Sequence, residues 1–145
     1  MKVLVIHGPN LNLLGTRELA IYGSTTLEQI NELIEKEATR LGHRVEIHQT
    51  SSESKIVDLL HEGVDRVDAG ILNPAAYSHT SRAIADALRS VPYPVVEVHL
   101  SNIHAREEWR RRSVTGEAAA AVVAGLGAGS YLAGLQGLAG LAESR

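Results

Sequence analysis

Polar side chains that can carry protons gather at the end of one hydrophobic segment of this chain. Glu97, His99 and Ser101 alternate there with apolar residues, so a β-strand would place all three side chains on one face. An imidazole held beside a carboxylate can donate a proton to a bound substrate. The spacing therefore makes His99 a candidate general acid and Glu97 its partner.

Two further hydrophobic segments also end in polar residues. One ends at Asn10 and is followed by a polar stretch that contains Arg17 and Tyr22, while the other ends at Asn73 and is followed by His79. If the three segments are neighbouring parallel strands, their carboxyl ends meet at one edge of a sheet, which is where open α/β sheets bind ligands. The three clusters together predict a site at that edge.

Each candidate also has a purely structural explanation. Asn10 and Asn73 adjoin prolines and suit turns, and His79 could simply precede a helix. Arg106 and Arg110, four positions apart on a short predicted helix, could form a solvated ion-pair face with the glutamates between them. The polar stretch after Asn10 could be mere surface. The joint occurrence of these residues at one predicted edge is what favours a site.

Short β-branched runs alternate with longer amphipathic segments along the chain, which predicts an α/β fold. The expected strands span residues 2–7, 44–48, 69–72, 94–98 and 120–126. The expected helices span residues 27–41, 54–64, 80–88 and 128–141. These elements suit a parallel sheet in the flavodoxin-like order 2-1-3-4-5, with helices on both faces. No repeat, linker or charge block divides residues 1–145, so we expect one domain.

Three features concern the surroundings of the site. The connection of about 15 residues between the first strand and the first helix is too long for a plain turn and predicts a lid. Asp86 lies seven residues after His79 on the same predicted helical face, two turns or ~10 Å further along. Asp86 either lies at the edge of the core or reaches into the site of a neighbouring subunit. The Gly- and Ala-rich C-terminal helix has a weak polar face, which favours packing against another subunit.

The composition excludes several classes of partner. The chain has 145 residues and a net charge of -3, which gives no general attraction to nucleic acid or anionic lipid. No apolar run reaches the ~20 residues of a membrane span. Because the sequence contains no cysteine, disulfides and thiolate chemistry are excluded, and its N-terminus lacks the features of a signal peptide. We therefore expect a cytoplasmic protein.

Several cofactor-dependent chemistries find little support. The glycine-rich run at 125–129 follows the last strand, where a dinucleotide fingerprint would not lie, and neither a Walker lysine nor a Gly-x-Ser-x-Gly elbow is present. Of the three lysines, two lie on predicted helix surfaces, which is a poor position for a Schiff base. Glu97, His99 and His104 could bind zinc, although their spacing matches no familiar metal signature.

The segments that carry these clusters resemble the signature blocks of the type II 3-dehydroquinate dehydratases. The matching segments, in the order and spacing of that family, are GPNLNLLGTRE, YG, ILNPAAYSHTS, DAL and EVHLSNIHAREEWR. The resemblance implies a flavodoxin-like fold and an anti dehydration of 3-dehydroquinate to 3-dehydroshikimate through an enolate, without cofactor or metal. It also implies a homododecamer built from trimers. The reaction would serve shikimate biosynthesis or quinate breakdown, in which the chemical step is the same.

The resemblance also implies roles for individual residues. Tyr22 would be the general base and Arg17 its activator on the lid, and Asn10 would hold the water that stabilises the enolate. His99 would be the general acid, oriented by Glu97. The residues implied in binding are Asn73, His79, Ser101, the Leu100 amide, Arg110, Asp86 from the adjacent subunit, and Arg106 as support for the Tyr22 region.

Four positions depart from the family pattern. Trp109 and Arg112 stand where the family more often has Phe and His, and Val114 and Gly116 stand where Tyr and Ser are common. We expect these changes to affect the packing of the trimer or the lid rather than the chemistry.

Elementary electrostatics supports the implied roles. A tyrosine with a pKa of ~10 is a poor base at neutral pH, because little of it is ionised. A guanidinium ~4 Å away, at an effective dielectric constant of ~20, contributes ~4 kcal/mol, or about three pKa units. Arg17 can therefore make Tyr22 a working base. The leaving hydroxide needs a proton, which a His99 imidazolium beside Glu97 can supply.

Two other classes of function stay open at this point. A non-catalytic flavodoxin-like module could bind a small polyhydroxy acid at the same polar edge, with the lid as a clamp, and would not require Tyr22. A metal-dependent hydrolase would require Glu97, His99 and His104 to converge on one ion. Sensitivity to a chelator separates this last class from the others.

Overall fold

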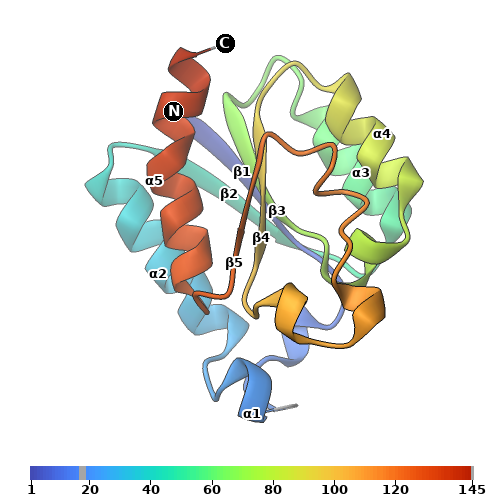
Figure 1. The fold of residues 1–145 in the computed structure, drawn as a ribbon. Helices are drawn as coiled ribbons and strands as arrows, with labels where there is room; N and C mark the ends of the chain where they lie inside the picture. The colour runs from blue at the N-terminus through green and yellow to red at the C-terminus, as the bar shows by residue number, and fades with distance from the viewer. Residues whose placement is uncertain (17–18, 145) are drawn as a thin grey trace.

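A parallel β-sheet forms the centre of the molecule (Figure 1). The computed structural model describes residues 1–16 and 19–144, and of Tyr22 only the backbone. Within these residues the strands are β1 (Lys2–His7), β2 (Arg44–Gln49), β3 (Ala69–Asn73), β4 (Val95–His99) and β5 (Ala121–Ala124). They pair in parallel in the order β2-β1-β3-β4-β5. The predicted flavodoxin-like strand order is confirmed.

Helices cover both faces of the sheet (Figure 1). α2 (Leu27–Arg40) and α5 (Gly129–Glu143) lie on one face, and α3 (Glu53–Glu62) and α4 (Arg82–Ser90) lie on the other. Strand alternation explains the two cores, because Val3 and Val5 of β1 pack toward α2 and α5 while Leu4 and Ile6 pack toward α3 and α4. None of the helices in the described part of the chain has both the length and the apolar character of a membrane span.

Short polar side chains set where the helices begin. Thr26 caps α2 in a reciprocal capping box with Gln29, and Ser52 caps α3. The Ser81 hydroxyl accepts a hydrogen bond of 3.0 Å from the Ile84 amide and starts α4. This cap explains why α4 begins at Arg82 rather than at the predicted residue 80.

The connections after β1, β3 and β4 are built from single helical turns. The predicted lid contains a 3-10 turn, η1 (Leu11–Leu13), and a short helix, α1 (Leu19–Tyr22). A turn η2 (Ala75–His79) follows β3, and two separate turns, η3 (Ile103–Ala105) and η4 (Glu108–Arg110), follow β4. The prediction of one short helix carrying both Arg106 and Arg110 is therefore wrong, because Arg106 lies in an extended conformation between the two turns.

The C-terminal helix packs closely on the sheet of its own subunit. An added Cβ at Gly134 would lie 3.4 Å from Val98 and 3.5 Å from Val96, so a small residue brings α5 near the strands. At Gly137 and Gly140 an added Cβ would meet no atom within 4 Å. That α5 also contacts another subunit stays a prediction.

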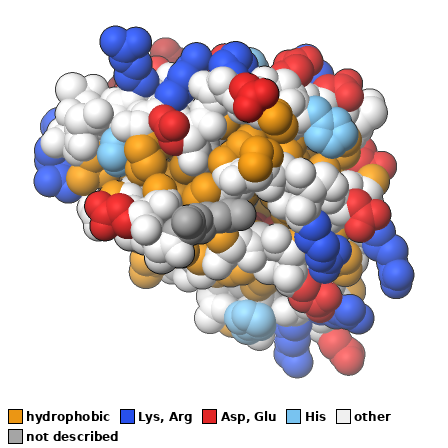
Figure 2. Space-filling model, turned by 90° about the horizontal axis from the view of Figure 1, so that it is seen from above, with side chains coloured by type: hydrophobic (Ala, Val, Ile, Leu, Met, Phe, Trp, Pro, Cys, Tyr) orange, Lys and Arg blue, Asp and Glu red, His pale blue; other side chains and the backbone are white. Residues whose placement is uncertain are grey.

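The two ends of the sheet differ in character. At the end where the strands begin, seen from above in Figure 2, hydrophobic side chains gather at the centre with charged side chains of both signs around them. A surface hollow at this end is lined by Val67, Tyr93 and Pro94, among others. The predicted acid–base residues lie at the opposite end, where β1, β3 and β4 finish.

Candidate active site

A pocket opens at the carboxyl ends of β1, β3 and β4, where the sequence predicts it. Its cavity measures about 100 Å³. The predicted site residues that line it are Asn10, Asn73, His79, His99, Leu100, Ser101, Arg106 and Arg110. The chain approaches itself closely just after β1 and β3, because an added Cβ at Gly8 would lie 2.8 Å from the backbone of Pro74. Only glycine fits between these two strand ends.

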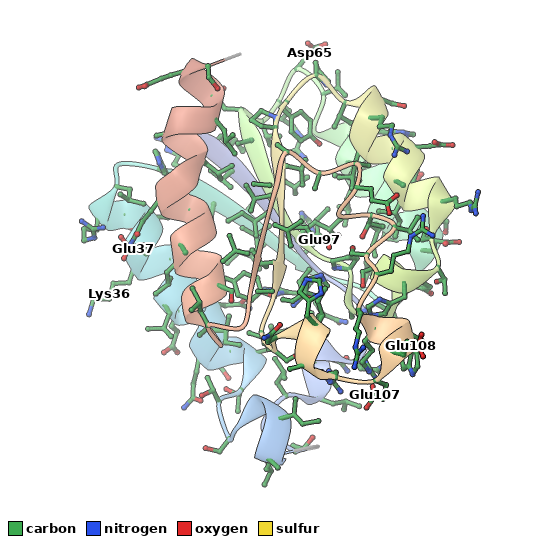
Figure 3. All side chains as sticks on the ribbon, viewed as in Figure 1. Lys36, Glu37, Asp65, Glu97, Glu107 and Glu108 are labelled. Atoms are coloured by element: carbon green, nitrogen blue, oxygen red, sulfur yellow. The ribbon has the colours of Figure 1, made fainter. Side chains whose placement is uncertain are left out.

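Glu97 and His99 form the predicted pair on one face of β4. His99 Nε2 donates to Glu97 Oε2 at 2.8 Å, and both residues are buried. Figure 3 shows Glu97 inside the molecule, with Glu107 and Glu108 nearer its edge. Because Nε2–H is held by the carboxylate, Nδ1 is the ring nitrogen left for an acid proton. Glu97 stabilises the positive charge that His99 carries when Nδ1 is protonated.

Two hydroxyl groups complete the surroundings of Glu97. Ser113 Oγ donates to Glu97 Oε2 at 2.5 Å, and Thr115 Oγ1 donates to Oε1. Three donors thus point at the two oxygens of one buried carboxylate, which has the lone pairs to accept all three hydrogen bonds. Gly116 lies against this cluster, because an added Cβ there would come within 3.0 Å of Glu97 Oε2. The departure from the family pattern at Gly116 therefore lies beside the acid–base pair.

The sequence did not reveal Ser113 and Thr115. They lie on an irregular segment between η4 and β5, where no periodicity indicates which side chains point inward. Thr115 is fully buried in this segment, so its hydroxyl needs a partner that only the folded chain supplies.

His79 and Trp109 form a second group at the pocket. His79 Nδ1 donates to the Arg112 carbonyl at 2.8 Å, which fixes the ring. Burial lowers the pKa of His79 below its usual value, and this outweighs the raising effect of that hydrogen bond. The Trp109 ring meets His79 edge-on, with centroids 5.2 Å apart. Trp109, which differs from the family pattern, thus contacts a candidate substrate-binding residue. The expectation that this difference concerns only the lid or the trimer interface is too narrow.

Arg110 is held from two sides. Its guanidinium carbon lies 4.1 Å from the centroid of the Trp109 ring, and its Nε donates to Glu107. That hydrogen bond lowers the pKa of the exposed Glu107 carboxyl below its usual range. Nearby, Arg106 Nη1 lies 3.4 Å from Ser101 Oγ. Both arginines line the pocket, so their side chains are more than a solvated surface pair.

The two asparagines serve turns and also line the pocket. Asn10 adopts a left-handed conformation with φ of 69°, which asparagine tolerates better than most residues. Asn73 is 3% exposed, and its Oδ1 accepts a hydrogen bond of 3.1 Å from the Ala75 amide. The structural and functional explanations of these residues are therefore compatible.

Some predicted residues do not join this pocket or cannot be placed. Asp86 is 84% exposed at its side chain and pairs with Arg89 at 3.8 Å, away from the pocket lining. The prediction that it shares a helical face with His79 is wrong, because His79 belongs to η2 and a new helix begins after Ser81. Arg17, and the neighbouring Glu18, lie outside the described residues, as does the side chain of Tyr22.

The alternative zinc site does not assemble. Within residues 1–16 and 19–144, no three His, Asp or Glu side chains are grouped so that they could hold a metal ion. Glu97 and His99 bind each other, while His104 is exposed and does not line the pocket. The three residues therefore do not converge on one ion.

The fold and the pocket define a class of protein, and comparison with known proteins identifies the family. An α/β sheet whose carboxyl edge holds a buried His–Glu pair, a second histidine and two arginines is suited to acid–base chemistry on a small anionic molecule. The family model described as dehydroquinase class II matches residues 1–139. The chain belongs to this family.

Individual relatives agree with this assignment. The chain is 49% identical to a 3-dehydroquinate dehydratase of Caldanaerobacter subterraneus, an alignment that covers 99% of this chain and 97% of the relative. It is 50% identical to a catabolic 3-dehydroquinase of Verticillium alfalfae, over 93% of this chain and 90% of that protein. The crystal structure of type II dehydroquinase from Butyrivibrio crossotus superposes with a TM-score of 0.94 at 40% identity, covering 96% and 97% of the two chains.

Proposed function

We propose that the chain carries out the dehydration of 3-dehydroquinate to 3-dehydroshikimate, the reaction of its family, at the pocket formed by β1, β3 and β4. The observation that carries this proposal is the buried His99–Glu97 pair: His99 lines the pocket, and Glu97 holds Nε2 and leaves Nδ1 as the ring nitrogen for the acid proton. The reaction is an elimination of water that is driven by acid–base groups of the chain and uses no cofactor. Residues 1–145 act as one catalytic domain.

The proposed reaction begins with loss of the proton alpha to the ketone. Tyr22, ionised with the help of Arg17, takes this proton, and the electron pair moves to the ketone oxygen to form an enolate. A water held by Asn10 donates a hydrogen bond to that oxygen. The left-handed Asn10 at the pocket wall supports this role.

Loss of the hydroxyl completes the elimination. His99 Nδ1–H donates its proton to the leaving hydroxyl as the carbon–oxygen bond breaks, so water departs and the enolate collapses to the conjugated enone. Glu97 stabilises the imidazolium before this step, and its hydrogen bonds with Ser113 and Thr115 keep the carboxylate in place. Tyr22 then returns a proton to solvent, and His99 regains one.

The other residues of the pocket bind the substrate. The carboxylate and hydroxyl groups of the substrate are bound by the pocket residues Asn73, His79, Ser101, Arg110 and the Leu100 amide. The contacts of Trp109 with His79 and Arg110 support this assignment, because they restrict both side chains. Arg106 supports the region of Tyr22.

An absorbance assay tests the proposal. The expected result is formation of a conjugated enone from 3-dehydroquinate, at a rate that EDTA does not change. Borohydride added with substrate should trap no covalent adduct, because no lysine lines the pocket among the described residues. Inactivation by EDTA would instead indicate a metal, and an adduct would indicate an imine. A protein that binds substrate without forming enone would be the non-catalytic module.

The assembly is a further part of this proposal. We expect a homododecamer built from trimers, in which Asp86 reaches the pocket of the adjacent subunit. The Asp86 side chain is 84% exposed within one subunit, which supports that role. β5 is an edge strand that carries the exposed Val122 and is followed by the exposed Leu126, and exposed apolar edge strands are usually covered in native proteins. A cytoplasmic location stays a prediction from composition.

Light scattering and one variant test the assembly. The protein should have about twelve times the mass of the 15.6 kDa subunit. Asp86→Ala should raise KM without changing the melting temperature, whereas Asp58→Ala on the exposed face of α3 should change neither. A fully active monomer at assay concentration would contradict the shared site.

A further inference from the structure

A hydrogen-bonded network of four side chains leads from Asn31 of α2 to Asn73 at the pocket, and the reaction described above gives no role to Asn31, His7 or Tyr131. His7 Nε2 lies 2.7 Å from Asn31 Oδ1, and His7 Nδ1 lies 2.8 Å from the Tyr131 hydroxyl. That hydroxyl in turn lies 3.1 Å from Asn73 Nδ2. His7 and Tyr131 are both fully buried. Asn73 is the residue of this network that lines the pocket.

The sheet register brings these residues together. His7 and Asn73 are paired positions at the ends of the adjacent strands β1 and β3. Alternation places both side chains on the face covered by α2 and α5, because Val5 and Ile71, two residues earlier in each strand, belong to that core. Tyr131, in the first turns of α5, then lies across both strand ends.

The hydrogen bonds of this network all run in one direction, with each donor on the side toward Asn73 and each acceptor on the side toward Asn31. Asn31 Oδ1 can only accept, so His7 Nε2 carries a hydrogen, and Nδ1 of the neutral ring accepts from the Tyr131 hydroxyl. The Tyr131 oxygen then accepts from Asn73 Nδ2. Burial lowers the pKa of His7 to about 4, so the ring is neutral near pH 7 and keeps this acceptor.

We propose that Tyr131 and His7 are positioning residues that hold the Asn73 amide in its orientation for binding substrate. One Asn73 N–H points to Tyr131 and one lone pair of Oδ1 points to the Ala75 amide, so the amide is fixed at both ends. Its second N–H and second lone pair are the groups available to a ligand. This inference rests on the proposed role of Asn73 in substrate binding.

Loss of the Tyr131 hydroxyl should weaken substrate binding. Tyr131→Phe keeps the ring in its buried site but leaves an Asn73 N–H and His7 Nδ1 without partners. The amide must then turn to satisfy its hydrogen bonds, and we expect KM to rise about five- to thirtyfold with a small change in kcat. Steady-state kinetics and thermal unfolding of each variant measure both effects.

Tyr93 provides a matched control. It is also buried, and its hydroxyl donates to the Leu60 carbonyl at 2.5 Å in the core on the other face of the sheet. Tyr93→Phe should lower the melting temperature and leave KM unchanged. If Tyr131→Phe does the same, its hydroxyl is only structural and the proposal is wrong.

A double-mutant cycle separates this proposal from the role of Asn73. Asn73→Ala should raise KM, and Tyr131→Phe should add nothing to that change, because its effect passes through Asn73. A full additional effect in the Asn73→Ala background would overturn the proposal. If Asn73→Ala leaves KM unchanged, the substrate role of Asn73 itself is contradicted, and the positioning role with it.

Variants of His7 provide an independent test. His7→Asn keeps an acceptor near the Tyr131 hydroxyl, whereas His7→Leu removes it. We expect KM close to that of the wild type for His7→Asn and a raised KM for His7→Leu. Equal KM values for the two variants would contradict the proposal.

Discussion

Replacement of Tyr22 by phenylalanine should remove most turnover and leave substrate binding measurable. The change keeps the aromatic ring and deletes the group proposed to take the alpha proton. General-base catalysis typically contributes ~10² to 10⁴ in rate, so kcat should fall by at least ~10²-fold. Enone absorbance measures turnover, and isothermal titration measures binding to the inactive variant. Binding should persist because Asn73, His79 and Arg110 are unchanged.

Exchange of the alpha proton with deuterated water isolates the step assigned to Tyr22. Tyr22→Phe should suppress this exchange along with product formation. Tyr77→Phe is a matched control, since its hydroxyl donates to the Ser51 carbonyl at 2.9 Å and the residue does not line the pocket. A Tyr22→Phe enzyme that exchanges the proton at the wild-type rate would refute the assignment of the base.

Arg17 should act on the same step through the pKa of Tyr22. A nearby guanidinium favours the phenolate, so Arg17→Ala should raise that pKa toward ~10 and slow turnover at neutral pH. The loss of turnover in Arg17→Ala should therefore shrink as pH rises, because a larger fraction of Tyr22 then ionises without the guanidinium. A loss that is constant from neutral to alkaline pH would indicate that Arg17 binds substrate instead.

The fold could be predicted because its signals are local and periodic. β1 and the start of α2 match the predicted residues, and the other strands differ by a few residues at their ends. β5 ends at Ala124 because Gly125 takes a left-handed conformation with φ of 92°, which the β-branched run before it does not reveal. Strand alternation was also sufficient to place Glu97 and His99 together.

Other parts of the site depend on contacts between distant segments. The Ser113 and Thr115 hydroxyls reach Glu97 across 16 and 18 positions of sequence from a segment without regular structure. Tyr131 reaches His7 across 124 positions. Neither contact leaves a periodic signal, because each depends on how a loop or helix closes over a strand end.

Errors in the prediction arose where one short cap or turn interrupts a helical pattern. Ser81 starts a new helix and removes His79 from the face that carries Asp86. The extended Arg106 separates two turns that the sequence suggested were continuous. In both cases the local hydrogen bonds of a few residues decide where a helix begins or ends. A sequence spacing of four or seven positions, which would place two residues on one face of a continuous helix, does not.

Replacement of His99 by alanine should stop the reaction after the first proton transfer. The variant lacks the acid that protonates the leaving hydroxyl, while Tyr22 and Arg17 are unchanged. Product formation should fall by ~10² to 10⁴. Exchange of the alpha proton with deuterated water should continue, because the enolate still forms and returns to substrate. This pattern is the reverse of that expected for Tyr22→Phe, in which exchange and product formation are lost together.

Glu97→Gln tests whether the carboxylate acts through His99. It removes the negative charge beside the ring and places an amide among the donors Ser113 and Thr115, so kcat should fall, though less than in His99→Ala. Glu37→Gln is a control, because it removes a carboxylate of α2 that pairs with Arg40 and does not line the pocket. In the double variant His99→Ala with Glu97→Gln, the second change should add little, since its effect passes through the missing ring. If His99→Ala stops proton exchange as fully as Tyr22→Phe does, His99 takes part in enolate formation, and its assignment as the acid of the second step is wrong.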